Sequence, residues 1–273
     1  MPTMASDHWT VTYNWSAGSG LRLGVCEYRG IRVLHNASVP FVYVDYQGPF
    51  GPFTDELRSL VSTVKIREIM HGFDLQVTYD WYGPDYQYDH IWRFHDDGQF
   101  ASFVMIHGPG EELAGKHTYH IPFRFDLDVS GATGDTFQRW QGYWADVSHE
   151  GRQFPAFPES PEFDWQVIDK QSSRRAMIRA HRGDSAECWP LRYKQAERWG
   201  SWGGAQPAPP GFDGSVPEIY ADGQPITNTD IVVWYIAHVS ASDLVAVCGP
   251  SFALRGFGED AHDDTEETHH DHH

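Results

Sequence analysis

Residues 85–108 carry tyrosine and histidine side chains at a spacing that could bring a phenol and an imidazole together. Every second side chain of a strand points to the same face, so one face here would hold Tyr86, Tyr88, His90, Trp92 and Phe94. Asp97-Gly98 is typical of a tight turn, and the stretch is therefore predicted to be a β-hairpin. Tyrosine and histidine both transfer protons in enzymes, but an aromatic face is also what a protein core requires. These residues alone leave both interpretations open.

The composition predicts a mostly β protein. Aromatic residues make up 15% of the 273 residues, whereas long leucine-rich periodic segments are almost absent. A chain of this length can form one large domain. We expect a single domain over residues 1–257 and an acidic, histidine-rich disordered tail over residues 258–273.

The charge and the terminal sequence limit the expected partners. The formal net charge is -18 and the Lys and Arg residues do not cluster, which argues against nucleic acid or an anionic membrane as a partner and favours a cationic substrate. No segment has the pattern of a signal peptide or a membrane span, so a soluble, cytoplasmic protein is predicted.

The cysteines and the terminal histidines give no catalytic metal site. Cys26, Cys188 and Cys248 are too few and too scattered for a disulfide framework, and we expect buried, unpaired thiols. The histidines at the end of the tail could bind divalent metal in vitro, could be the remnant of a purification tag, or could be solvated: they are His269, His270, His272 and His273.

Short alternating apolar segments between turn signals indicate strands. They lie at residues 9–15, 21–28, 31–37, 40–46, 73–82, 120–129, 230–239 and 251–257. The exception is residues 53–70, where Thr54 could cap a helix and Asp55 would lie in its first turn, so one short helix is predicted. Residues 200–223 are rich in Gly and Pro and are predicted to form a long loop. Strands without alternating helices predict a large antiparallel β-sandwich.

Several segments, taken in order, resemble the catalytic domain of the copper amine oxidases, which is a large antiparallel β-sandwich. The segments are "GLRLGVCEYRGIRVLHNASVPFVYVDY", "DYQYDHIWRFHDDG", "FRFDLDVSG", "CWPLRYKQAER" and "DIVVW". Together they cover most of residues 20–255, with large deletions relative to the family. The resemblance implies a copper enzyme that oxidises a small amine through topaquinone, a cofactor made from one of its own tyrosines.

The resemblance also implies roles for two residues. Without a gap, the quinone tyrosine falls on Tyr86, although Tyr82, Asp85 and Gln87 replace the family's Thr, Asn and acidic residue around it. The aspartate that removes a proton from the substrate is best matched by Asp55, for which the start of a helix is the competing interpretation.

The family's copper ligands are a His-x-His pair before the "FRFDLD" segment and a third histidine beyond "DIVVW". Here the pair falls on His117 and Tyr119, with His120 one residue away on the opposite strand face. The third position falls on Ala241, and His238 lies nearby. The resemblance thus implies copper held by His117, His120 and His238, which requires a bulge in the strand.

Three functions follow from these observations, and the resemblance favours the first. The first is a compact copper amine oxidase-like enzyme that uses Tyr86, Asp55 and copper. The second is a metal-free enzyme that keeps the fold and uses Tyr86, His90 or Asp55 as acid or base, for example in a cyclisation or isomerisation of a small molecule. The third is a binding or scaffold protein. The family's enzymes are homodimers joined by long β-hairpin arms. This short chain has little room for such arms, so the resemblance leaves open whether it forms a homodimer.

Overall fold

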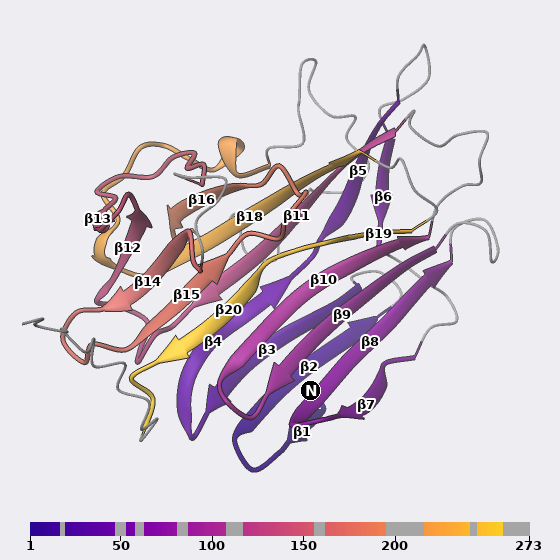
Figure 1. Cartoon of the computed structure of the whole chain (residues 1–273), viewed down its shortest axis with the longest axis horizontal. Helices are drawn as coiled ribbons and strands as arrows, with labels where there is room; N and C mark the ends of the chain where they lie inside the picture. Colours follow the sequence, from indigo (N-terminus) through magenta and orange to yellow (C-terminus); the bar gives the residue numbers. More distant parts are fainter. Residues whose placement is uncertain are drawn as a thin grey trace, which may run out of the picture.

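The computed structural model describes most of the chain. The described residues are 1–16, 20–46, 53–57, 63–80, 87–107, 117–155, 162–194, 216–240 and 245–258. Within them the protein consists almost wholly of antiparallel strands, arranged in two sheets that face each other. In Figure 1, β8, β9 and β10 of one sheet lie in front of β2 and β3 of the other. The predicted antiparallel β-sandwich is confirmed.

The first sheet contains the strands that carry all three predicted metal ligands. Its strand order is β1 (Thr3–Ala5), β2 (Trp9–Ser16), β3 (Gly20–Tyr28), β4 (Ile31–Ser38), β11 (His117–Leu127), β18 (Ile231–Ser240) and β16 (Glu187–Arg192). Two more strands extend it: β5 (Phe41–Tyr46) pairs with β11, and β6 (Phe53–Glu56) pairs with β5.

The second sheet contains the hairpin with the aromatic face. Its strand order is β13 (Trp144–Asp146), β12 (Asp135–Trp140), β14 (Trp165–Asp169), β15 (Arg175–Arg179), β20 (Ser251–Arg255), β10 (Gln99–His107), β9 (Gln87–His95), β8 (Gly72–Asp80) and β7 (Lys65–Ile69). In addition, β17 (Thr227–Thr229) pairs with β12 and β19 (Val245–Cys248) pairs with β10.

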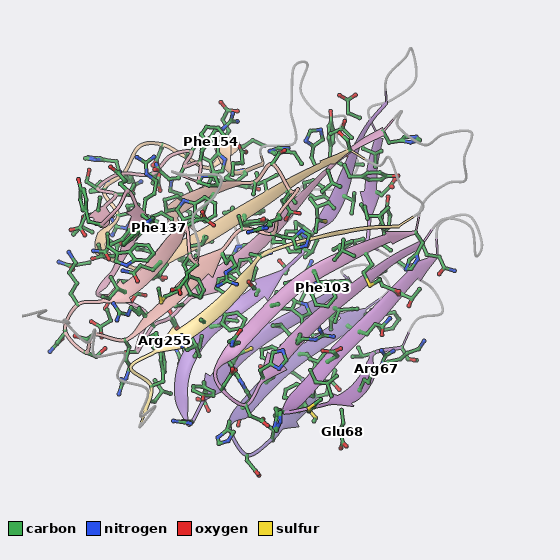
Figure 2. All side chains as sticks on the ribbon, in the orientation of Figure 1. Arg67, Glu68, Phe103, Phe137, Phe154 and Arg255 are labelled. Atoms are coloured by element: carbon green, nitrogen blue, oxygen red, sulfur yellow. The ribbon has the colours of Figure 1, made fainter. Side chains whose placement is uncertain are left out.

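The core lies between the sheets and is rich in aromatic rings. Trp92 of β9 packs against Phe125 of β11 with ring centroids 5.8 Å apart, and Phe125 also contacts Phe252 of β20 at 4.6 Å. These contacts join the two sheets because β11 belongs to the first and β9 and β20 to the second. The burial of these apolar rings between the sheets is the main favourable term in folding. At the β7 edge of the second sheet, by contrast, Arg67 and Glu68 project outward (Figure 2).

The β9–β10 hairpin has the predicted alternation. Tyr88, His90, Trp92 and Phe94 are all buried. The turn contains Gly98 at a φ of 85°, a backbone conformation that glycine adopts without steric cost. Asp97 supports the turn by accepting a hydrogen bond from the backbone N–H of Gln99 at 3.0 Å.

The helix predicted over residues 53–70 is wrong for the described part of that range, which leaves out residues 58–62. Residues 53–56 form β6, which pairs with β5, and residues 65–69 form β7, which pairs with β8. Pairing with neighbouring strands outweighs the helical spacing of a short apolar pattern. Asp55 is therefore a strand residue opposite Val42 and not part of a helix start. The described residues contain one short 3-10 helix, Val216–Ile219.

Two smaller expectations can also be compared with the structure. Cys26, Cys188 and Cys248 are free and buried, as predicted. None of the helices in the described part of the chain is long and apolar enough to cross a membrane. The single-domain boundary stays a prediction, and residues 259–273 of the predicted tail lie outside the described residues.

Candidate functional site

A short hydrogen bond joins the two sheets at one end of the sandwich. The Tyr88 hydroxyl, on β9, donates to Asp55 Oδ2, on β6, at 2.5 Å. Tyr88 is fully buried, whereas Asp55 is partly exposed. Hydrogen bonds of a hydroxyl to a carboxylate are short and stronger than bonds between neutral groups. The pair thus places a partly exposed carboxylate against a fixed phenol.

Two further side chains lie near this pair on β11. The Tyr119 ring is 6.4 Å from the Tyr88 ring, at a nearly perpendicular 79°, and the His117 ring is 6.1 Å from that of Tyr119. His117 and Tyr119 are both buried and are two residues apart, so they share the inner face of β11. We call Asp55, Tyr88, Tyr119 and His117 the inner cluster.

Two positions implied by the resemblance cannot be placed. Tyr86, together with Tyr82 and Asp85, lies outside the described residues. Ala241, where the third ligand falls without a gap, lies outside them as well. The structure therefore describes the strand that follows Tyr86 but not Tyr86 itself.

The structure brings together two of the three candidate metal ligands. His120 of β11 lies directly opposite His238 of β18, and their Nδ1 atoms are 2.6 Å apart. His117 does not join them. Its register with β5 continues to His120 without a shift, so the bulge that would turn both histidines to one side is missing. The β11 irregularity against β4 lies further along, between Asp126 and Leu127.

The described histidines do not fit the three-imidazole copper site of the family. Such a site needs three nitrogens around one point, each about 2 Å from it. His117 points to the inner face of β11, whereas His120 and His238 point to the outer face, next to Tyr43. On the inner face, the second ligand position holds the phenol of Tyr119 in place of an imidazole.

His90 lies deeper in the sandwich, on the same strand face as Tyr88. It is fully buried, and its Nε2 is 3.2 Å from Ser102 Oγ. Burial lowers the pKa of His90 to about 3, because the charged imidazolium would lose its hydration. His90 is therefore neutral at ordinary pH and is a poor proton donor.

A group of carboxylates away from the inner cluster was missed by the sequence analysis. Asp126, Asp128 and Asp230 offer oxygen atoms within 4.8 Å of one another. Burial, together with the negative charge of Asp128, raises the pKa of nearby Asp135 to about 9. The available signal was the Asp-x-Asp spacing in "FRFDLD", which puts both carboxylates on one strand face. Clustered carboxylate oxygens of this kind could hold a hard cation such as Ca²⁺.

We expect Ca²⁺ to stabilise the protein through this group. At a free concentration 100 times the Kd, binding to the folded state alone adds about 2.7 kcal/mol to the free energy of unfolding. Asp128→Asn should remove most of that gain, measured as the difference in Tm between Ca²⁺ and EDTA. Asp146→Asn is the control, because Asp146 is exposed and pairs with Lys170. An equal Ca²⁺ shift in Asp128→Asn and in the unmodified chain would contradict the prediction.

The structure is similar to those of copper amine oxidases. The chain superposes on a copper-containing benzylamine oxidase from Hansenula polymorpha with a TM-score of 0.63 and 12% identity, covering 94% of this chain and 60% of that one. The Pichia pastoris lysyl oxidase gives 0.64 and 11%, covering 92% and 51%. An Aspergillus nidulans amine oxidase gives 0.62 and 12%, with the same coverages of 92% and 51%. No protein-family model and no curated protein matches the sequence.

These similarities define the fold. The chain has the fold of the copper amine oxidase catalytic domain, as the resemblance of its sequence segments implied. It spans between about half and three fifths of the length of the solved relatives. At 11–12% identity the similarity establishes the fold and leaves the chemistry to be argued from the residues of this chain.

Proposed function

We propose that this chain uses the amine oxidase fold for metal-independent acid–base chemistry on a small molecule, with Asp55 as the base. The observation that carries the proposal is the 2.5 Å hydrogen bond from Tyr88 to Asp55, which links the two sheets. It holds the carboxylate in one orientation. The acidic composition, with a net charge of -18, favours a neutral or cationic substrate.

The pair supports a proton transfer that needs no oxidant. Asp55 would take a proton from a carbon next to a carbonyl group, and the same carboxyl would return it to another atom of the substrate. The Tyr88 hydroxyl would steady the carboxylate and remain a hydrogen-bond donor throughout. Isomerisations and cyclisations are reactions of this type. His90 does not take part as an acid, because it is neutral and deep in the core.

The copper amine oxidase-like function is the alternative that the fold favours. It would require copper held by His117, His120 and His238, and a quinone formed from Tyr86. The opposite faces occupied by His117 and by the other two histidines argue against this ligand set. An amine as substrate, a homodimer and a cytoplasmic location remain predictions made from the sequence.

Hydrogen exchange at carbon tests the proposal. The full chain, treated with EDTA, would be incubated in D₂O with a panel of small enolisable ketones, and loss of the α-proton signals would be followed by NMR. We expect exchange above the buffer rate for at least one ketone, unchanged by EDTA. Exchange no faster than in buffer, or exchange that disappears with EDTA and returns with copper, would overturn the proposal.

A further inference from the structure

The outer face of the first sheet carries a histidine pair that the proposed chemistry does not use. Tyr43, His120 and His238 lie side by side on β5, β11 and β18, as the strand register requires. The His120 and His238 rings have centroids 4.8 Å apart and are tilted by 73°. Their Nδ1 atoms face each other at 2.6 Å. At that distance a hydrogen must lie between the nitrogens.

A buried carboxylate lies on the other side of His238. Glu187 Oε1 is 3.8 Å from His238 Nε2, and the Glu187 side chain is only 2% exposed. Two neighbours hold it in place: Arg152 Nε is 3.0 Å from Oε2, and Trp189 Nε1 donates to Oε1 at 3.0 Å. The carboxylate favours a proton on the Nε2 of His238 and thereby directs its Nδ1 lone pair toward His120.

We propose that His120 and His238 bind a divalent transition-metal ion such as Zn²⁺ through their Nδ1 atoms. Imidazole nitrogens suit these ions, and histidines that bind metal usually have a carboxylate near their other ring nitrogen. Here the Glu187 carboxylate lies 3.8 Å from His238 Nε2, close enough for an ion pair but too far for a direct hydrogen bond. Two nitrogens about 2.0–2.1 Å from a tetrahedral ion are about 3.3 Å apart. The ion would displace the hydrogen between the two nitrogens, which would leave to solvent or be replaced by a proton on His120 Nε2. A small ring rotation that opens the present 2.6 Å separation would then admit the ion, with water completing its coordination.

This site is separate from the inner cluster. His120 points away from His117 and Tyr119, because adjacent residues of a regular strand face opposite sides of the sheet. The His238 side chain keeps 21% of its surface exposed, which gives an ion access from solvent. A bound ion would join β18 to β11, and β11 carries His117 and Tyr119 of the inner cluster. The inference does not depend on the proposed acid–base function.

Zn²⁺ binding to matched variants of the full chain tests the proposal. The tail histidines could also bind metal, so the informative quantity is the difference between variants that all keep the tail. By calorimetric titration with Zn²⁺, the unmodified chain should bind one equivalent more than His120→Gln or His238→Gln. Glu187→Gln should keep the site but weaken it by about 10–100-fold. His107→Gln is the control, because His107 also contacts a carboxylate, that of Asp89 at 3.0 Å, but lies on the second sheet.

A second measurement uses the unmodified chain and does not depend on how the variants fold. Diethyl pyrocarbonate modifies accessible imidazoles, and peptide mapping would report each histidine separately. We expect Zn²⁺ to protect His120 and His238 and to leave His107 unaffected. Equal Zn²⁺ stoichiometry in the unmodified chain and both histidine variants, or protection confined to the tail, would overturn the proposal.

Discussion

Asp55→Asn should lower the rate of catalysed carbon–hydrogen exchange by about 10²–10⁴-fold, the usual contribution of a positioned acid–base group. Asparagine has nearly the same shape as aspartate but cannot accept the substrate proton. Its side-chain oxygen can still accept the hydrogen bond from Tyr88, so the link between β6 and β9 is kept. The measurement is the NMR exchange assay in D₂O, with far-UV circular dichroism and Tm as checks on folding.

Tyr88→Phe separates the role of the phenol from that of the carboxylate. Loss of a hydrogen bond to a charged group costs about 1.5–3 kcal/mol, and with Asp55 less firmly held we expect a smaller fall in exchange, about 10-fold. Tyr28→Phe is the matched control. Tyr28 is also fully buried, and its hydroxyl donates to the backbone oxygen of Asp96 at 3.0 Å, outside the inner cluster. Full activity in Asp55→Asn would remove Asp55 from the mechanism.

The buried His90 should make the protein progressively less stable in acid. Its pKa is about 3 in the folded protein, below the ordinary value of 6.5 expected when the chain unfolds. Between these two pH values the unfolded chain binds a proton that the folded chain does not, so stability falls as the pH falls. The expected slope is roughly 1.4 kcal/mol per pH unit, which over the whole window is on the order of 5 kcal/mol.

His90→Gln tests this pH dependence. Glutamine does not titrate and can still reach a hydrogen-bond partner such as Ser102. The free energy of unfolding would be measured in urea at several pH values from 7 to 4. Per pH unit, it should fall less in His90→Gln than in the unmodified chain, by roughly 1.4 kcal/mol. His35→Gln, at an exposed position on β4, should keep the wild-type slope. If His90→Gln loses stability in acid as steeply as the unmodified chain, His90 is not the group responsible.

The sequence predicted the parts of the fold that depend on local alternation. The aromatic face from Tyr88 to Phe94 and the turn at Gly98 follow from period-two spacing and from glycine conformation. The strand β6 was missed because its residues match the start of a helix. Their conformation is decided by pairing with β5, a tertiary contact that local spacing does not contain.

The candidate site was predictable only in part. Alternation placed His117 and His120 on opposite faces of β11, but whether a bulge would reverse this depends on pairing with β5. Asp55 was selected by the resemblance, whereas its partner Tyr88 was seen only as a neighbour of Tyr86. The two residues are 33 positions apart and meet across the sandwich. A contact of this kind follows from sheet packing and has no local signature.

The most direct test of metal-independent chemistry is the fate of Tyr86 when copper and oxygen are supplied. The full chain, first stripped of metal, would be incubated aerobically with and without one equivalent of copper, and the peptides across residues 80–95 would be mapped by mass spectrometry. Peptide mass is informative even if copper binds to the tail or to His120 and His238. We expect the peptide that contains Tyr86 to keep its unmodified mass in both samples. A copper-dependent oxidised Tyr86 would contradict the proposed function and show that the chain makes the quinone of an amine oxidase.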